Sequence, residues 1–178
     1  MHMSSVVKQW TLEEVHSLPD DGNKYELVRG ELFVTPAPTP SHETITSRLS
    51  RILDRYVEQH GLGLVYHARA VMRFQGSEVE PDLMVRQPPS DEDGWDNAPT
   101  PILVVEVLSP STRRRDQVQK RSLYVDAGVA EYWMVDPERR LITVVQQGSE
   151  VVVAREVLRW SPAGAAAELT FEVARVFG

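Results

Sequence analysis

Three titratable residues in the middle of the chain, Asp82, Glu106 and Lys120, have the types and order that could support metal-dependent hydrolysis. Two carboxylates offer the hard oxygen ligands that Mg²⁺ prefers, and Mg²⁺ usually completes its coordination with water and substrate phosphate. A nearby lysine could position or help deprotonate the water that attacks phosphorus, while the cation stabilises the developing negative charge. The set predicts phosphodiester hydrolysis with Mg²⁺, or with Mn²⁺ as a substitute.

Glu106 is the member of this set that most needs a partner. It interrupts the apolar, β-branched run at residues 101–109, which is typical of a central strand. An isolated charge buried there is unfavourable unless a metal or an opposite charge meets it. Pro81-Asp82 belongs to another strand-like segment, on which Glu80, Asp82 and Met84 share one face, and it supplies the second carboxylate.

The spacing brings Lys120 level with Glu106 if the strand is followed by a returning helix. From Glu106 to Ser109 the strand rises about 10 Å, and from Thr112 to Lys120 a helix descends about 12 Å. Asp116 precedes Lys120 by four residues on the same helical face, so it could orient the lysine or simply form a surface ion pair with it. The three main residues could also form a buried structural network without a metal.

The elements around this set are those of a mixed α and β protein. A capping box at Thr11 and Glu14 predicts a first helix through His16, and Arg29-Gly30 predicts a hairpin turn. Ser41 is expected to cap the longest helix, which runs to Gly61. Other strands are predicted at residues 64–67, 70–74, 78–85, 102–108, 131–136, 141–145, 150–154 and 168–173, with a helix at 112–127. We expect an α/β (α+β) fold with a mixed central sheet flanked by helices, in one domain over residues 1–178.

Composition narrows the class of protein. The chain has a net charge of -7 and no cysteine, so disulfides and zinc-thiolate sites are excluded and a cytoplasmic location is expected. An acidic protein of this kind is unlike one that coats nucleic acid non-specifically. The longest apolar runs are far shorter than a membrane span, and no membrane association is expected.

The dense basic cluster of the chain flanks the predicted lysine. It comprises Arg113, Arg114, Arg115 and Arg121, at the start of a helix whose free N–H groups also favour phosphate. A backbone phosphate of nucleic acid could dock there, or the cluster could be a solvated helix face. His42, at the start of the long helix, could approach the same phosphate or be an ordinary helix residue.

Four blocks of sequence carry a resemblance to a known family. They are Tyr25-Glu-Leu-Val-Arg-Gly-Glu-Leu32, Pro81-Asp82, Glu106-Val-Leu-Ser-Pro-Ser-Thr112 with Asp116 and Lys120, and Gly128-Val-Ala-Glu-Tyr-Trp-Met-Val-Asp-Pro137. In this order they resemble the PD-(D/E)xK nuclease superfamily, and within it the Uma-two family of restriction-endonuclease-like proteins. The resemblance covers almost the whole chain.

The resemblance implies a restriction-endonuclease-like core and a Mg²⁺-dependent endonuclease that acts on DNA. Asp82 and Glu106 would hold the metal together with the main-chain carbonyl of Val107. The superfamily pattern places a lysine two residues after the glutamate, where this chain has Leu108, and Lys120 on the following helix would replace it. Glu26 is the candidate auxiliary carboxylate, unless it is a surface residue of the hairpin.

Two further expectations concern assembly and activity. Cutting both strands of a duplex is simplest with two sites related by symmetry, which favours a homodimer. The leucine at position 108 and the acidic net charge leave an alternative, in which the chain is a catalytically inactive nuclease-like module that binds nucleic acid or a protein partner.

Overall fold

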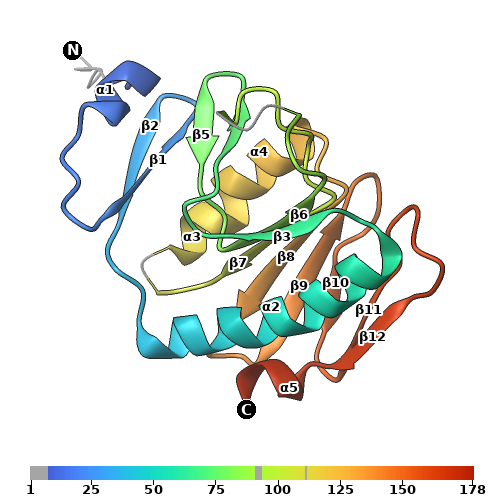
Figure 1. Ribbon diagram of the computed structural model, residues 1–178. Helices are drawn as coiled ribbons and strands as arrows, with labels where there is room; N and C mark the ends of the chain where they lie inside the picture. The colour runs from blue at the N-terminus through green and yellow to red at the C-terminus, as the bar shows by residue number, and fades with distance from the viewer. Residues whose placement is uncertain (1–7, 91–93, 111) are drawn as a thin grey trace.

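A six-stranded mixed sheet forms the centre of the computed structural model, which describes residues 8–90, 94–110 and 112–178 (Figure 1). Its strand order is β10-β9-β8-β7-β6-β3. The strands are β3 (Leu64–His67), β6 (Leu83–Arg86), β7 (Leu103–Val107), β8 (Glu131–Asp136), β9 (Leu141–Gln146) and β10 (Val152–Ala154). Since β7 and β8 run parallel while the other neighbours are antiparallel, the expected mixed sheet is confirmed.

Two smaller sheets lie beside the central one. The first has the order β2-β1-β5-β4 and the second pairs β11 with β12. Their strands are β1 (Lys24–Val28), β2 (Glu31–Thr35), β4 (Met72–Phe74), β5 (Ser77–Val79), β11 (Val157–Trp160) and β12 (Leu169–Glu172). The hairpin between β1 and β2 turns at Arg29 and Gly30, both at positive φ, as the sequence predicts.

Helices cover both faces of the central sheet, as Figure 1 shows for α2 in front of the strands and α4 behind them. They are α1 (Leu12–His16), α2 (Pro40–His60), α3 (Arg113–Arg115), the π-helix η1 (Asp116–Lys120), α4 (Arg121–Asp126) and α5 (Ala174–Phe177). The segments α3, η1 and α4 follow one another without a break and form the crossover from β7 to β8. One hydrophobic cluster lies on the α2 side of the sheet, and a second lies on the α4 side.

Alternation along β7 decides which residues reach each cluster. Val105 and Val107 belong to the cluster under α2, whereas Val104 and Leu108 belong to the cluster on the α4 side. Glu106 therefore points to the side of the sheet that the crossover covers. This places its carboxylate against the helix that carries Lys120.

The structure corrects two local predictions and contains two further elements. Thr39 is the N-cap of α2, with Pro40 in its first turn, so the prediction that Ser41 caps this helix is wrong. Residues 78–85 do not form one strand: β5 and β6 lie in different sheets, and Asp82 lies just before β6. Strand β11 and helix α5 were not predicted. In the described part of the chain, no helix has the length and apolar character needed to cross a membrane.

Candidate active site

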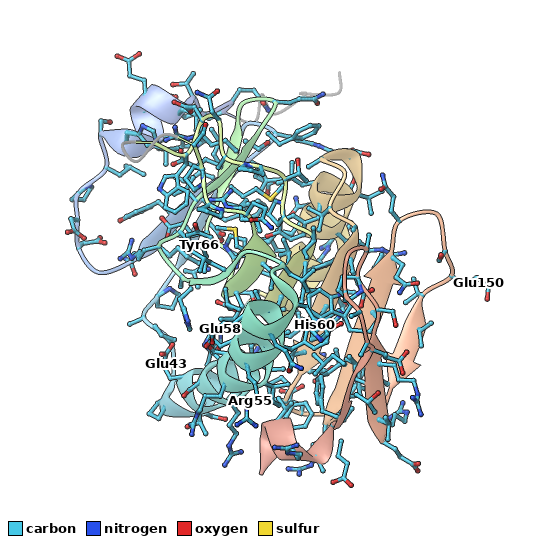
Figure 2. The ribbon with its side chains drawn as sticks, turned by 45° about the vertical axis from the view of Figure 1, so that its right-hand side comes forward. Glu43, Arg55, Glu58, His60, Tyr66 and Glu150 are labelled. Carbon is cyan, nitrogen blue, oxygen red and sulfur yellow. The ribbon has the colours of Figure 1, made fainter. Side chains whose placement is uncertain are left out.

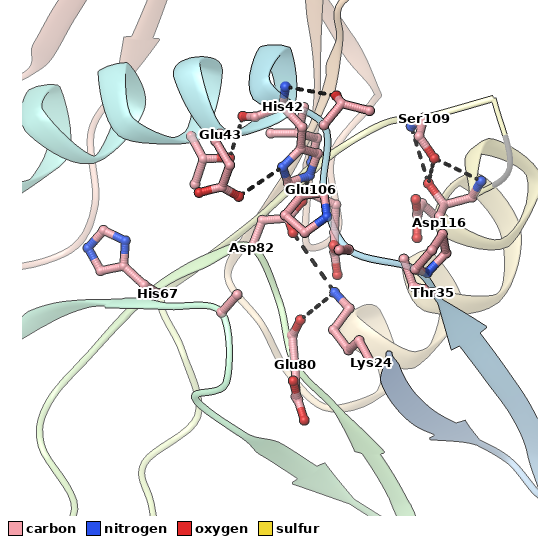
Figure 3. Close-up of a pocket in the computed structure, with 18 of the residues that line it drawn as sticks. Lys24, Thr35, His42, Glu43, His67, Glu80, Asp82, Glu106, Ser109 and Asp116 are labelled. Carbon is pink, nitrogen blue, oxygen red and sulfur yellow. Dashed lines mark hydrogen bonds and ion pairs between the residues drawn. The ribbon is translucent and has the colours of Figure 1, made fainter. Parts of the chain in front are cut away.

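Asp82 and Glu106 meet at one end of the central sheet. The antiparallel register pairs Leu83 with Val105, so the next position along places Asp82 opposite Glu106. Both line a cavity of about 350 Å³, shown in Figure 3, to which the start of α2, β1 and the start of the β7–β8 crossover contribute. The predicted pair of carboxylates is thus brought together.

Asp82 is held ionised by three different groups. Its Oδ2 accepts hydrogen bonds from the Val107 backbone N–H at 2.8 Å and from His42 Nε2 at 3.1 Å. Lys24 Nζ lies 3.9 Å from Oδ1. Burial alone would raise the pKa of the Asp82 carboxyl, but the bond from His42 and the charge of Lys24 outweigh it and lower the pKa to about 2.

Glu106 has the opposite electrostatic environment. Lys120 Nζ donates to its Oε1 at 2.7 Å, and the hydroxyl of Tyr124 donates to the same oxygen at 2.6 Å. Burial nevertheless raises the pKa of the Glu106 carboxyl to about 7, because desolvation outweighs the ion pair with Lys120 and the nearby Asp82 charge adds to it. Two facing carboxyls thus have pKa values pushed apart by their surroundings.

Lys120 lies behind the two carboxylates in a fully buried ion-pair network. Its Nζ is 2.7 Å from Glu106 Oε1, 2.8 Å from Glu26 Oε1 and 3.9 Å from Asp116 Oδ1, and the residue is 0% exposed. Burial alone would lower the pKa of Lys120, but Glu106 and Glu26 raise it above its usual value. The surface ion-pair interpretation is therefore wrong, since both Lys120 and Asp116 are buried.

The π-helix η1 presents both charged residues to this network. Asp116 begins η1 and Lys120 ends it, and the wider turn of a π-helix is frequent at functional sites. The Tyr132 hydroxyl donates to the Asp116 carbonyl at 3.1 Å, which ties the wide turn to β8. Sequence spacing alone gave no sign that the regular helix would be interrupted here.

Glu26 joins the site from the first hairpin. Its Oε1 accepts from the Glu80 backbone N–H at 2.9 Å and from Lys120, and its side chain is fully buried. The interpretation of Glu26 as a surface residue is wrong. Although burial would raise its pKa, Lys120 and then Lys24 lower it below the ordinary value.

Lys24 is a functional candidate that the sequence reasoning missed. It lines the cavity, and its Nζ donates to the Glu80 carbonyl at 2.9 Å while lying 3.8 Å from Glu26 Oε1. Figure 3 shows it between Glu80 and Asp82. The signal that could have found it is its spacing, because Lys24 and Glu26 are two residues apart on a strand and therefore face the same side.

Unsatisfied polar atoms are concentrated at this site. Among the residues that the structure describes, four buried side-chain atoms have no hydrogen-bond partner, and three of them are Glu26 Oε2, His42 Nδ1 and Glu80 Oε2. Most buried polar groups in folded proteins are paired, so a concentration of exceptions calls for an explanation. Each of the three atoms has a charged or titratable side chain 3.6–3.8 Å away, beyond hydrogen-bond distance, and two of the residues, His42 and Glu80, line the cavity.

The predicted phosphate-binding arginines have different surroundings. Arg113 pairs with Asp136 and, at 2.7 Å, with Glu138. Arg115 lies 3.8 Å from Glu26 Oε2 and 3.4 Å from Asp116 Oδ1, and it lines the cavity. Arg114 is exposed and Arg121 is partly exposed.

The oxygen atoms at the cavity fit a hard divalent cation. The carboxylates of Asp82 and Glu106 lie beside the main chain of Val107. The N–H and carbonyl of one strand residue point the same way, so the Val107 carbonyl is directed to the same side as the N–H that reaches Asp82. Within residues 8–90, 94–110 and 112–178, no group of three histidine or acidic side chains forms a complete metal cage. Mg²⁺ is commonly held by only one or two carboxylates, with water and phosphate completing the shell, so two carboxylates suffice.

Comparison with known proteins assigns the chain to a family. Residues 12–174 match the family Uma2, described as "Putative restriction endonuclease". The chain belongs to the Uma2 family. A crystal structure of a putative nuclease belonging to DUF820 from Anabaena variabilis is similar to it, with a TM-score of 0.80 and 21% sequence identity over 94% of this chain and 97% of the other.

The structural likeness establishes the fold, and the family match covers nearly the whole chain. No curated protein matches the sequence significantly. The expected Uma2 membership and the nuclease-like mixed fold are confirmed. The metal, the mechanism and the roles of Asp82, Glu106 and Lys120 stay predictions, to be tested on the protein itself.

Proposed function

We propose that this Uma2 protein is a Mg²⁺-dependent endonuclease that hydrolyses phosphodiester bonds in DNA, with Mn²⁺ able to replace Mg²⁺. The observation that carries the proposal is the meeting of Asp82 and Glu106 across β6 and β7 at one cavity, with two lysines beside them. Membership of a family described as putative restriction endonucleases supports the choice of nucleic acid as substrate.

The two carboxylates and the Val107 carbonyl would hold the cation. When bound, Mg²⁺ supplies a positive charge that stabilises the charge developing on the phosphoryl oxygens. Lys120 fixes Glu106 from the buried side through its 2.7 Å contact, and the Tyr124 hydroxyl reaches the same oxygen. The carboxylate is thereby kept in one orientation, which is the preorganisation that a catalytic site requires. Lys120 therefore positions the attacking water indirectly, by orienting Glu106. Glu26 contacts Lys120 and keeps the lysine in place.

Lys24 is the lysine that faces the cavity and could meet the substrate. Its ammonium group lies on the open side of Asp82, where a non-bridging phosphate oxygen or the attacking water would sit. Arg115 lines the same cavity and adds a second positive charge near the phosphate. His42 bonds Asp82 and holds this carboxylate in place.

Plasmid cleavage tests the proposal directly. Purified protein should nick supercoiled plasmid DNA in the presence of Mg²⁺ or Mn²⁺ and not in the presence of a chelator. Asp82→Asn and Glu106→Gln should each lose at least about 100-fold in rate, equivalent to about 2.7 kcal/mol of transition-state stabilisation. Glu58→Gln, at an exposed position of α2, is the matched control and should keep full activity. Equal activity of Glu106→Gln and the native protein would refute the assignment.

A non-cleaving module that binds nucleic acid or a protein partner is the second candidate. It is favoured by the Glu106 Oε1 atom, which already accepts from Lys120 and Tyr124. Metal-independent, salt-sensitive DNA binding without cleavage of duplex, branched or single-stranded substrates would establish this function and exclude the first. The endonuclease proposal includes a homodimer. Analytical sedimentation of the protein with a DNA duplex tests whether two chains assemble.

A further inference from the structure

A second basic surface lies away from the active-site cavity, between the outer side of α2 and the segment formed by β12 and α5. A hollow of about 340 Å³ opens there, and we call it the arginine hollow. Four arginines line it together with three apolar side chains and one threonine. The lining residues are Arg48, Arg51, Ile52, Arg55, Leu169, Thr170, Phe171 and Arg175.

The four arginines of the hollow lack the ion pairs that most other basic side chains make. Within the described residues, none of them lies within 4.0 Å of a carboxylate. Asp54 and Glu58, which follow Arg51 and Arg55 by three positions, form no ion pair within 4.0 Å with them in the described part of the chain. Asp54 instead accepts from the Ser50 hydroxyl at 2.8 Å, and Figure 2 shows Arg55 and Glu58 on α2. In a chain of net charge -7, this is a concentrated positive surface.

The arrangement is unfavourable for the isolated helix. Arg51 and Arg55 are four residues apart and Arg48 is three before Arg51, so like charges face one another on successive turns. Only backbone and hydroxyl groups reach two of them: Arg48 donates to the Val176 carbonyl at 3.3 Å and Arg51 to Ser47 at 3.3 Å. An anion in the hollow would relieve this repulsion.

We propose that the arginine hollow binds backbone phosphates of the nucleic acid that flanks the cleaved bond, an inference that rests on the proposed function. Arginine suits phosphate because its planar fork makes two parallel, charge-assisted hydrogen bonds. The cavity itself carries several carboxylates, and the charges of Arg113 and Arg115 are offset by Asp136 and Glu26. A polyanion therefore needs attraction from another surface, and the hollow provides it.

Helix α2 fixes the distance between the two surfaces. His42 contacts the cavity, and Arg55 is 13 positions further along, about 20 Å at the helical rise. Arg51 also lies about half a turn around the helix from His42. Arg48, Arg51 and Arg55 lie 6, 9 and 13 positions after His42, which is about 9, 14 and 20 Å along the helix. The hollow therefore meets DNA about three to six base pairs from the cavity at about 3.4 Å per pair, and not the scissile phosphate.

Binding of fluorescent DNA duplexes tests this surface separately from catalysis. Anisotropy is measured with the full chain in a chelator, which prevents cleavage, at several salt concentrations. Arg51→Ala/Arg55→Ala should bind a duplex of about 20 base pairs about tenfold more weakly, with the salt slope reduced by about two. Both side chains are exposed, so folding is preserved, and circular dichroism confirms it. The matched control is Arg139→Ala/Arg155→Ala, which removes the same charge at exposed positions elsewhere and should bind as the native chain does.

Duplex length and a free anion separate the possible sources of phosphate. A duplex of about six base pairs centred on the cavity extends only about 10 Å to either side, so it ends short of Arg51 and Arg55 and should be affected little by the double substitution. Binding of a free anion is measured by titrating the chain with inorganic pyrophosphate. The arginine Nε–H signals in nuclear magnetic resonance show whether the anion reaches the hollow. Perturbation of these signals by pyrophosphate but not by DNA would overturn the assignment to nucleic acid.

Failure of this inference can be told apart from failure of the proposed function. Equal DNA affinity of the native chain and Arg51→Ala/Arg55→Ala, or no DNA binding by the native chain, overturns the hollow as a nucleic-acid site. Weaker binding by this variant supports the hollow even if the native chain never cleaves, in which case only the endonuclease assignment falls. Loss of cleavage in Glu106→Gln together with weaker DNA binding by Arg51→Ala/Arg55→Ala supports both.

Discussion

The two sides of the Asp82 and Glu106 pair are built differently. On the inner side, Lys120 is 0% exposed and contacts Glu106 and Glu26 at hydrogen-bond distance. On the cavity side, Lys24 stands 3.8 and 3.9 Å from its carboxylate neighbours and lines the open space. The same pair of carboxylates thus has one lysine locked into the protein and another that faces the substrate space.

This difference suggests a structural role for Lys120 and a catalytic role for Lys24. A buried lysine between carboxylates is costly to disturb, because each partner left alone is an uncompensated charge in a poorly solvated interior. A lysine at a cavity wall can turn toward a phosphate oxygen at the cost of one hydrogen bond to the Glu80 carbonyl and two longer carboxylate contacts, so its loss should affect folding less. We therefore expect substitutions on the inner side to reduce stability and substitutions on the cavity side to reduce activity.

Lys120→Met should have the largest effect on stability. It removes the positive charge that Glu26 and Glu106 share, and we expect the free energy of unfolding to fall by about 3–5 kcal/mol. Urea unfolding followed by tryptophan fluorescence measures this change. Lys8→Met, at an exposed lysine, is the control. A loss below about 1 kcal/mol in Lys120→Met would show that the inner side is not a structural network.

Leu108→Lys restores the lysine of the superfamily pattern but should not restore function. Leu108 is 4% exposed and packs in the cluster on the α4 side of the sheet, where an additional ammonium group would be buried among apolar side chains. We expect a loss of about 2–4 kcal/mol in stability and no gain in cleavage rate. Leu108→Met, which keeps an apolar side chain of similar volume, should cost less than about 1.5 kcal/mol. Faster cleavage by Leu108→Lys would contradict the assignment of the lysine role to other positions.

Lys24→Met should reduce activity while leaving the fold intact. If Lys24 meets the phosphate oxygen, kcat should fall about 100-fold, or about 2.7 kcal/mol, and Lys24→Arg should recover part of it. Calorimetry of Mn²⁺ binding should show affinity no lower than in the native chain, since a positive charge near Asp82 has been removed. A larger effect on unfolding than on kcat would place Lys24 with Lys120 on the structural side.

The pH dependence of stability tests the raised pKa of Glu106 on the inner side. Because burial raises the pKa of Glu106 to about 7, the folded chain holds a proton there that the unfolded chain releases near pH 4.5. This residue therefore contributes stability at pH 4.5 that is lost as pH rises to about 7. In a chelator, the native chain should lose stability over this range relative to Glu106→Gln. Parallel stability curves for the two proteins would contradict the raised pKa.

Local patterns in the sequence were sufficient to predict much of the fold. The capping box of α1, the turn at Arg29 and Gly30, and the end of α2 at Gly61 depend on short-range hydrogen bonds and on positive φ, and the structure confirms all three. The break between β5 and β6 was missed because both pieces have strand-like composition. Only the pairing of β5 with β1, and of β6 with β7, sends them to different sheets.

At the site, the sequence predicts which residues are involved but not how they are buried or paired. The sequence by itself determined the order of Asp82, Glu106 and Lys120 and, through strand and helix rise, that the lysine returns level with Glu106. Only the tertiary structure decided that Lys120 is enclosed on the inner side, that Lys24 lines the cavity, and that Arg113 is paired while Arg55 is not. The reason is physical: rise per residue is a property of a local segment, whereas burial and ion pairing depend on which distant segments pack together.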